Sequence, residues 1–202
     1  MIELILASKS PRRRELMKLL GHPFKCITSH IEENYIEGET PAQHVIRLSE
    51  LKAVNVGGKN VHGIIIGSDT IVVLDNEILG KPRSPEEALE MIMRLQGCTH
   101  SVYSGFAVYN TENKKISSGY EKSEVTMRKI PLDIAKKYVD TKEPLDKAGS
   151  YGIQGYGSVL IKSIKGCFFN VMGLPLSRVM ETIYISSNGR YGYFGTTEDL
   201  LK

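Results

Sequence analysis

The chain has 202 residues, of which 26 are basic and 23 acidic, giving a formal net charge of +3, and 41% of the residues are hydrophobic. This length suits one domain or two small lobes, and this composition excludes a globally disordered chain. The charge excess is too small to indicate a polyanionic partner, so we expect no stable nucleic-acid binding.

The cysteines and the apolar segments bear on the cellular compartment. The three cysteines lie far apart without a C-x-x-C pair, which argues against a disulfide framework and a structural zinc site. No stretch approaches the ~20 apolar residues of a membrane span. The six residues between Met1 and Ser8 are too few for a signal sequence. These features predict a cytoplasmic protein without a membrane partner.

The N-terminal part of the chain predicts strands that alternate with capped helices. Strands are expected at residues 2–7, 24–28 and 64–74, and helices at 11–20 and 41–56. Ser10 and Thr40 are residue types that cap helices, and each is followed directly by a proline. The leucines expected on the inner face of the first helix are Leu16, Leu19 and Leu20. The β-branched run at 64–74 is typical of a strand buried on both faces.

The remainder predicts a helix, a long hairpin and a glycine-rich loop. The expected elements are a helix from residue 85, strands at 99–109 and 115–127, a helix near 132–140, a glycine-rich loop at 149–157, two strands around 165–166, and a helix from 174 to 186. A capping box at Ser84 to Glu87 opens the first of these helices. Its expected buried residues are Ala88, Met91, Ile92 and Leu95. No repeat or linker divides the chain, which predicts a single domain over residues 1–186 and a loose C-terminal tail over 187–202.

The segment 8–14 (SKSPRRR) is a candidate anion site. A strand runs into a hydroxyl-rich turn and then into a helix whose first turn carries three arginines. Free amides, the positive helix end and guanidinium groups together suit phosphates. Arginines here oppose the helix dipole, which costs a few tenths of a kcal/mol each unless an anion compensates. The alternative is a solvated basic surface turn.

Asp69 is an acid within a mostly apolar run, which is costly unless the carboxylate is paired, hydrogen bonded or bound to a metal. One interpretation is a structural aspartate that caps a nearby loop. The favoured one is a carboxylate that holds a divalent cation, activates water, or both. An aspartate near pKa 3.9 is a poor base at neutral pH, and a metal that acidifies water removes this difficulty.

Two lysines and a glycine-rich segment complete the candidates. Lys52 lies on the helix after Thr40, and Lys81 follows the long strand; ammonium groups suit phosphate oxygens, although either residue alone is more often a surface lysine. The segment 146–157 can bring backbone close to a ligand, and the Gln154 amide can both donate to and accept from a base edge. Its G-x-x-G-x-G spacing is not the dinucleotide-binding pattern, and the chain has no P-loop.

Four segments together resemble the Maf (septum formation protein) family of nucleoside triphosphate pyrophosphatases. They are 4–16 (LILASKSPRRREL), 67–72 with 80–82 (GSDTIV and GKP), 143–155 (EPLDKAGSYGIQG) and 170–176 (NVMGLPL). The match runs in order over about residues 2–180 without a departure inside the motifs. The resemblance implies a mixed α/β fold similar to that of inosine triphosphate pyrophosphatases. That fold is a long mixed sheet flanked by helices, with a cleft between two lobes.

The family hydrolyses a nucleoside triphosphate between its α- and β-phosphates with a divalent cation such as Mg²⁺ or Mn²⁺. By this resemblance Asp69 is the catalytic acid, and Asp69 and Glu33 are candidate metal positions. The phosphate-handling positions are Ser8, Arg12, Arg13, Lys52 and Lys81. Arg12, Thr70 and Gln154 match the subgroup that prefers dTTP and UTP. Another subgroup has Trp, Gln and Glu at these positions and prefers 7-methyl-GTP.

The resemblance thus implies an enzyme whose partner is a nucleoside triphosphate, with modified pyrimidine nucleotides as further candidates, and it is compatible with a homodimer. Two other classes compete with this interpretation. One is a division-inhibitor scaffold that acts through protein contacts, as the family name suggests. The other is a weak nucleic-acid binder that uses the arginines at 12–14. Metal-dependent turnover of dTTP and UTP would separate the enzyme from a pure binding module.

Overall fold

The computed structural model describes residues 2–58 and 61–195. In this part of the chain the strands are β1 (Glu3–Leu6), β2 (Lys25–Cys26), β3 (Gly63–Leu74), β4 (Glu77–Leu79), β5 (Thr99–Asn110), β6 (Lys115–Met127) and β7 (Ile161–Lys165). They form a sheet in the order β2-β1-β3-β5-β6-β7, with β4 attached to β3. The pairs of β1 with β2 and β3 are parallel, whereas β3–β4 and β6–β7 are antiparallel. The sheet is therefore mixed, as expected.

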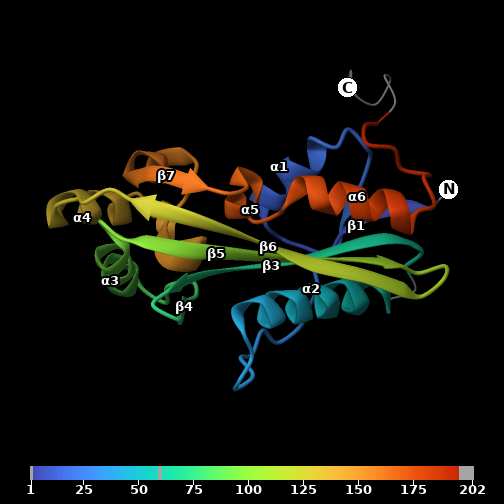
Figure 1. Cartoon of the computed structure of the whole chain (residues 1–202), viewed down its shortest axis with the longest axis horizontal. Coiled ribbons are helices and arrows are strands. Elements are labelled where there is room, and N and C mark those ends of the chain that lie inside the picture. The colour runs from blue at the N-terminus through green and yellow to red at the C-terminus, as the bar shows by residue number, and fades with distance from the viewer. Residues whose placement is uncertain (1, 59–60, 196–202) are drawn as a thin grey trace. The chain divides into compact units, whose positions relative to one another are not determined.

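Helices connect the strands (Figure 1). They are α1 (Pro11–Lys18), α2 (Pro41–Gly57), α3 (Pro85–Leu95), α4 (Leu132–Asp140), α5 (Phe168–Met172) and α6 (Leu176–Ser186), with the short 3-10 helices η1 (Glu143–Asp146), η2 (Ala148–Ser150) and η3 (Gly155–Leu160). The mixed α/β class predicted from the sequence is confirmed. Within the described ranges, no helix is long and apolar enough to cross a bilayer.

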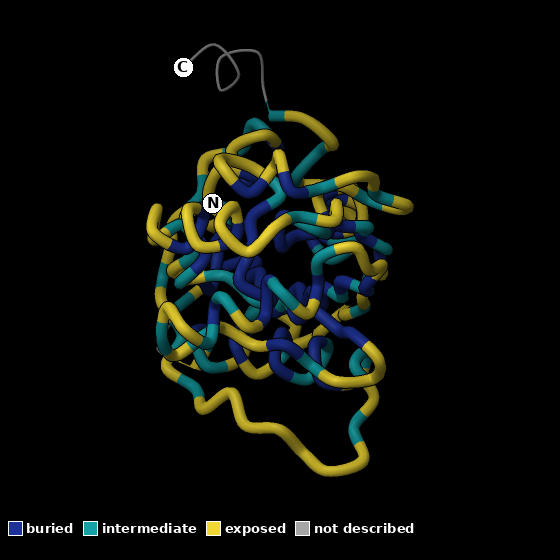
Figure 2. Tube along the Cα trace, turned by 90° about the vertical axis from the view of Figure 1, so that its left-hand side faces the viewer, coloured by how far each residue is buried: buried dark blue, intermediate teal, exposed yellow. Residues whose placement is uncertain are grey.

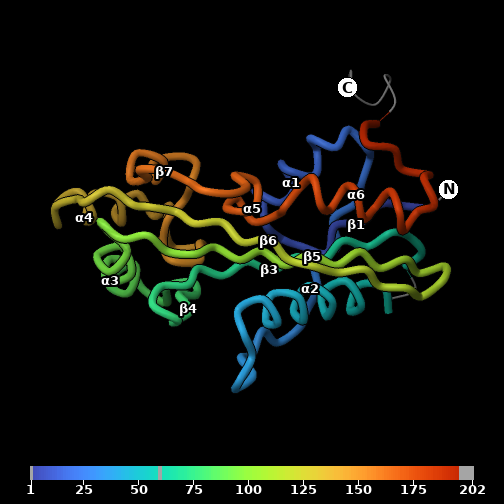
Figure 3. Tube along the Cα trace, in the orientation of Figure 1, coloured from blue at the N-terminus to red at the C-terminus, as the bar shows by residue number. Residues whose placement is uncertain are grey.

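The chain forms two compact units. The first unit comprises Met1–Asp69, Ser104–Glu121 and Gly173–Lys202, and the second comprises Thr70–Tyr103 and Lys122–Met172. The chain passes from one unit to the other inside β3, β5 and β6, and again between α5 and α6. The trace in Figure 3 can be followed through each of these strands without a separate linker.

In the first unit, α2 covers one face of the strands, and α1 and α6 lie on the other face (Figure 1). The contact with α2 is close enough to require glycine on β3, because a Cβ at Gly67 would collide with the carbonyl oxygen of Ser49. Apolar side chains fill the space between the strands and α2: Ile5, Ala7, Ala53, Val56, Ile65 and Ala107. This packing brings the middle of α2 directly against β3.

The two helix starts that the sequence predicts in the first unit form as expected. The Ser10 Oγ accepts from the backbone N–H of Arg13 at 3.4 Å, and Pro11 is the first residue of α1. Thr40 and Gln43 form a complete capping box at the start of α2, with bonds of 3.3 and 2.9 Å. These bonds satisfy N–H groups that lack a partner inside the helix. They also fix the helical register of the candidate basic residues.

The second unit has its own apolar core. The helices α3 and α4 form where the sequence predicts them, and so do β5 and β6, of which this unit holds the first part and the last part respectively. All four residues expected on the inner face of α3 are buried. The core joins strands to α3, α4 and η3, and among its members are Val72, Leu79, Ile92, Val125, Val139 and Leu160. The unit therefore gains stability from burial within itself.

Three local predictions hold only in part. Leu19 is 58% exposed, because α1 ends before it and the following turn directs it outward. The strand expected at 24–28 is only two residues long. The capping box of α3 is half formed: Ser84 Oγ accepts from the N–H of Glu87 at 3.2 Å, but the Glu87 carboxylate accepts from the N–H of Arg83 at 2.7 Å. In a complete capping box Glu87 would accept from the N–H of Ser84, the N-cap residue; here it accepts from the N–H of Arg83 instead.

Of the two strands predicted around 165–166, only the first forms. β7 is present, but beyond Gly166 the chain forms the short helix α5 instead of a returning strand. The side chain of Asn170 donates to the carbonyl of Val102 at 3.1 Å and to the hydroxyl of Ser123 at 2.9 Å. These buried bonds tie α5 to β5 and β6.

The C-terminal segment after α6 is not loose as far as residue 195. The Tyr191 hydroxyl donates to the carbonyl of Ile2 at 2.6 Å, and the N–H of Gly195 donates to the carbonyl of Leu20 at 3.2 Å. These bonds hold the segment against the N-terminal part of the first unit. The remainder of the predicted tail, residues 196–202, lies outside the described residues.

Candidate active site

Two carboxylates converge on one ammonium group in the first unit. Nζ of Lys52 lies 2.6 Å from Oδ1 of Asp69 and 2.9 Å from Oε1 of Glu33. The side chains of Lys52 and Asp69 are 7% and 9% exposed, whereas that of Glu33 is 54% exposed. Charged side chains are almost never buried unless they are paired. Of the three ways in which the sequence allows Asp69 to be buried, pairing is the one present, and the partner is Lys52.

Asp69 and Lys52 meet because β3 and α2 are in direct contact. Asp69 follows the apolar first part of β3, and Lys52 lies about three turns into α2, counted from its cap at Thr40. The close approach at Gly67 brings this turn of the helix against the strand. Lys52 is consequently not the surface lysine that its residue type alone would suggest.

Glu33 reaches Lys52 from an exposed loop between β2 and α2. Residues 32–38 are all exposed, and Figure 2 shows this loop as the yellow segment at the bottom of the view. Arg47 of α2 holds the loop, because its guanidinium donates to the Asn34 carbonyl at 3.0 Å and pairs with the Glu39 carboxylate. Helix α2 therefore carries Lys52 and also anchors the backbone beside Glu33.

Ser8 lies just beyond the end of β1, where the neighbouring strand β3 continues towards Asp69. The N–H of Ala7 donates to the carbonyl of Ile66 at 2.8 Å, which continues the parallel pairing to this point. Ser8 is buried, and its Oγ accepts from the N–H of Ser10 at 3.1 Å. The carboxyl ends of parallel strands, followed by helix starts, are where α/β proteins commonly bind ligands.

Arg13 is fixed by the backbone. Its Nε donates to the carbonyl of Gly173 at 2.8 Å, and the same carbonyl accepts from the hydroxyl of Ser68 at 3.1 Å. Burial lowers the pKa of the Arg13 guanidinium, whereas the charges of Asp69 and Glu33 oppose this lowering. An arginine remains charged under such shifts, so Arg13 places a fixed cation beside the two carboxylates.

The first unit holds six of the predicted site residues: Ser8, Arg12, Arg13, Glu33, Lys52 and Asp69. We call them the carboxylate–lysine cluster with its basic turn. Arg12 is half-buried in the first turn of α1, and no acidic residue in that turn balances the arginines. The predicted conflict with the helix dipole is thus present and is not relieved from within the helix.

The second unit holds the other three predicted residues: Thr70, Lys81 and Gln154. Thr70 is half-buried on β3, and Lys81 is exposed. The carbonyl of Gly80 accepts from the N–H of Gly149 at 3.0 Å, which joins the segment of Lys81 to the start of the glycine-rich segment. Gln154 is exposed and directly precedes η3. The glycine-rich loop predicted at 149–157 is wound into η2 at its start and η3 at its end, and residues 151–154 lie between these short helices.

Sequence reasoning missed the carboxylate that organises this segment. Glu143 accepts from the hydroxyl of Tyr138 at 2.9 Å and from the N–H groups of Tyr156 and Gly157 at 2.8 and 3.0 Å. Desolvation alone would raise the pKa of Glu143, but these hydrogen bonds hold it below its ordinary value. The one signal in the sequence is that Glu143 opens the third family-like motif.

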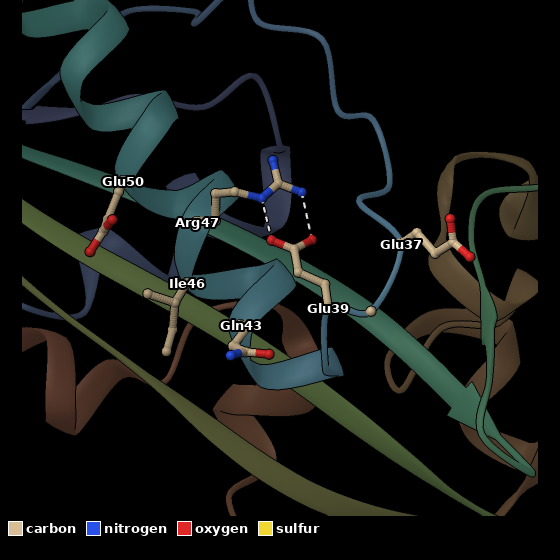
Figure 4. A pocket seen from close by; sticks show the side chains of 7 residues that line it. Glu37, Glu39, Gln43, Ile46, Arg47 and Glu50 are labelled. Carbon is tan, nitrogen blue, oxygen red and sulfur yellow. Dashed lines mark hydrogen bonds and ion pairs between the residues drawn. The ribbon is translucent and has the colours of Figure 1, made fainter.

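A separate hollow of about 450 Å³ lies at the start of α2. Figure 4 shows the residues that line it: Glu37, Gly38, Glu39, Gln43, Ile46, Arg47 and Glu50. Three of them are glutamates, and Arg47 is turned to the Glu39 carboxylate with two parallel contacts. Such a lining repels a triphosphate, and no predicted phosphate-handling residue takes part in it. The hollow is therefore a poor candidate for the nucleotide site.

A divalent cation fits the donor set of the cluster. Among the residues that the structure describes, no group of three or more His, Cys, Asp and Glu side chains could hold a metal by itself. Mg²⁺ is usually bound through one or two carboxylates, with water and substrate phosphates completing its shell. Asp69 and Glu33 already meet at a single cation, the ammonium of Lys52, so their oxygens fit such a shared site.

Basic side chains at the carboxyl end of a strand, followed by a helix start, suit a site that binds an anionic ligand. The family model described as Maf-like protein matches residues 3–184 of this chain. The chain belongs to this family, as the four motifs predicted.

Several bacterial proteins named dTTP/UTP pyrophosphatase are similar over most of their length. The protein of Syntrophus aciditrophicus is 45% identical over 90% of this chain and 88% of its own. Those of Pelotomaculum thermopropionicum and Clostridium tetani are 43% and 44% identical over 91% and 87% of this chain, and over 96% and 93% of their own. A solved nucleoside-triphosphatase / dITP/XTP pyrophosphatase of Mycobacterium abscessus is 12% identical, with a TM-score of 0.43, and covers 94% of this chain and 95% of its own. Such a distant likeness supports no conclusion.

Proposed function

We propose that this protein hydrolyses dTTP and UTP to the nucleoside monophosphate and pyrophosphate. The observation that carries the proposal is the convergence of Asp69 and Glu33 on Lys52, in a family member whose relatives bear the name dTTP/UTP pyrophosphatase. Modified pyrimidine nucleotides are further candidate substrates. Arg12, Thr70 and Gln154 support the preference, because they are the residues of the dTTP- and UTP-preferring subgroup.

A divalent cation, Mg²⁺ or Mn²⁺, belongs to the proposal, with Asp69 and Glu33 as its protein ligands. When bound, such a cation neutralises phosphate charge and makes water more acidic. The donor chemistry supports this assignment, since two carboxylates with room for substrate oxygens are the usual protein contribution to a Mg²⁺ site.

The reaction needs a base, a positioned triphosphate and compensation for charge on the leaving group. In our proposal Asp69 accepts the proton of the water whose oxygen forms the new bond to the α-phosphorus. The bond from the α-phosphorus to the bridging oxygen breaks, and its electrons leave with pyrophosphate. Lys52, Lys81 and Arg13 offset the negative charge that grows on the phosphate oxygens. Ser8 and Arg12 complete the phosphate contacts.

Base selectivity is assigned to Gln154 with Thr70 and Arg12. The carboxamide of Gln154 both donates and accepts, so it can pair with the O4 and N3–H edge of uracil or thymine. A cytosine presents the opposite pattern at both positions. Gln154 is exposed, so its amide discriminates once a bound base covers it, because the wrong base then leaves this polar group unpaired.

Location and assembly complete the proposal. The described cysteines Cys26, Cys98 and Cys167 are free thiols, which supports a reducing compartment such as the cytoplasm. A homodimer is the assembly that the family likeness favours, and light scattering of the purified protein would measure it.

Pyrophosphate release across a nucleotide panel tests the proposed function. The substrates are dTTP, UTP, dCTP, GTP and 7-methyl-GTP, each with Mg²⁺, with Mn²⁺ and with a chelator. We expect metal-dependent release that is highest for dTTP and UTP. Glu37→Gln serves as a matched control for carboxylate variants, because Glu37 is exposed on the same loop as Glu33. Folded protein without turnover of any of these nucleotides would overturn the proposal in favour of a binding module.

A further inference from the structure

The glycine-rich segment of the second unit is wrapped around the carboxylate of Glu143. Oε1 accepts from the Tyr138 hydroxyl at 2.9 Å and from the N–H of Gly157 at 3.0 Å, and Oε2 accepts from the N–H of Tyr156 at 2.8 Å. Both carboxylate oxygens are thus used. Hydrogen bonds to an ionised acceptor are about twice as strong as neutral ones. The backbone N–H groups of Tyr156 and Gly157, which follow Gln154 and Gly155, are therefore held firmly.

The other side of the segment is held through Tyr138. Its hydroxyl donates to Glu143 and accepts from the N–H of Gly152 at 3.0 Å. Burial raises the pKa of Tyr138, so the hydroxyl keeps its proton for the bond to Glu143. The contacts of the pair therefore bracket Gln154, with Gly152 fixed before it and Tyr156 after it.

Gly155 shows how tightly the segment is wrapped. It has a φ of +69°, and a Cβ there would collide with the carboxylate of Glu143. Only glycine suits this backbone conformation and this distance. The backbone directly after Gln154 thus lies against the Glu143 carboxylate.

The Gln154 side chain depends on this support. It is exposed, and no hydrogen bond of its amide to another described residue holds it. The point from which the side chain starts is therefore set by its backbone, whose neighbours on both sides are bound to Glu143 and Tyr138. A recognition group needs such support to stay within about 0.5 Å of its productive position.

We propose that Glu143, with Tyr138, is a positioning residue for base selectivity. It acts through the backbone around Gln154 and does not touch the nucleotide. The proposal rests on the proposed function for the identity of the base, since it assumes that Gln154 reads a pyrimidine edge. The new element is that the preference between bases depends on the Glu143 carboxylate, which does not itself contact the base.

The variants Glu143→Gln and Tyr138→Phe test this role. Glutamine at 143 has one acceptor oxygen, and its NH₂ faces an N–H group that needs an acceptor. Tyr138→Phe removes only the bridging hydroxyl and guards against misfolding of the first variant. Asp140→Asn is the matched control, because it removes one negative charge from an exposed position at the end of α4.

We expect the preference for UTP over CTP, measured as a ratio of kcat/KM values, to fall roughly tenfold in Glu143→Gln and less in Tyr138→Phe. The loss should appear in the KM for UTP, with kcat for UTP within about twofold of the wild type, because the catalytic groups lie in other segments. Hydrogen exchange should show faster exchange of the N–H groups of Tyr156 and Gly157. An unchanged preference despite faster exchange would overturn the proposal.

A double-mutant cycle with Gln154→Ala separates positioning from a general structural effect. If Glu143 acts through Gln154, Glu143→Gln should not change the UTP/CTP ratio further once the amide is gone. A further loss of equal size in the Gln154→Ala background would contradict this mode of action. A general loss of structure would instead lower kcat on every nucleotide.

Binding of α,β-imido analogues of UTP and CTP keeps the two proposals distinguishable. Should the wild type fail to hydrolyse UTP, the proposed function falls. The Kd ratio of the analogues would still decide the role of Glu143. Equal ratios in the wild type and Glu143→Gln would overturn the positioning role, and a lower ratio in the variant would support it.

Discussion

Nζ of Lys52 lies 2.6 Å from Oδ1 of Asp69, and both side chains are buried. Glu33 approaches the same ammonium group at 2.9 Å. The ammonium group of Lys52 thus occupies the position at which the carboxylates of Asp69 and Glu33 meet. A divalent cation bound by these oxygens would compete with Lys52, and the phosphates of a substrate would offer Lys52 a new partner.

Lys52→Met should make the carboxylate pair dependent on metal. Without the ammonium group, the two carboxylates repel each other. We expect the free energy of unfolding in chelator to fall by about 3 kcal/mol, the lower end for a broken buried ion pair, because Glu33 is half exposed. Mn²⁺ should raise the Tm of the variant more than that of the wild type, since binding to the native state stabilises it.

Thermal melts with and without Mn²⁺ make this measurement without any substrate. Lys115→Met is the matched control, because Lys115 is exposed on β6. An equal Mn²⁺ shift in the wild type and in Lys52→Met would contradict the competition.

Lys81→Ala should lower turnover with little effect on folding. Lys81 is exposed at the turn before α3, and surface substitutions usually change stability within about ±0.5 kcal/mol. Loss of a phosphate contact should reduce kcat/KM for UTP. The measurement is activity per folded molecule together with Tm. A large fall in Tm with unchanged activity would make Lys81 a structural residue.

The three subgroup positions should set the substrate ranking. Replacing all of them, as Arg12→Trp, Thr70→Gln and Gln154→Glu, should erode the preference for dTTP and UTP. The new acidic group favours the positive ring of 7-methyl-GTP. The readout is kcat/KM for each nucleotide in the wild type and in the triple variant. An unchanged ranking in a folded, active variant would place selectivity at other residues.

Glu39 should contribute stability that is lost in acid. The hydrogen bonds from Arg47 lower the pKa of Glu39 below its ordinary value of 4.5. The contribution is therefore complete above the unfolded-state pKa and is lost as the pH falls through the lower folded-state pKa. The Tm difference between the wild type and Glu39→Gln should be constant near pH 7 and shrink below about pH 4.5. A difference that grows in acid would contradict this sign.

Local sequence rules predict much of the fold. Ser10 and Thr40, each followed directly by a proline, identify helix starts from adjacent residues alone. The apolar run of β3 likewise predicts both the strand and the need for a partner at Asp69. These features depend on contacts close in sequence or on burial, and both leave a mark in composition and spacing.

The remaining features depend on contacts between distant segments. Nothing local shows that Lys52 is buried, because that follows from the close approach of α2 to β3 at Gly67. Glu143 could not be linked to the backbone around Gln154, since the link is made by winding the intervening residues into short helices. The apolar residues after Gly166 suit either a strand or a helix, and buried bonds of Asn170 decide for α5.

The measurement that tests the central claim most directly is turnover of UTP by Asp69→Asn beside the wild type and Glu37→Gln. Asparagine is nearly isosteric and keeps an oxygen that can accept from Lys52, so the variant should stay folded. It cannot take the proton of the attacking water or hold a cation as a carboxylate does. We predict a loss of at least ~100-fold in kcat for Asp69→Asn, on the scale of a lost general base, and near-wild-type turnover for Glu37→Gln. Near-wild-type release of pyrophosphate by folded Asp69→Asn would contradict the account.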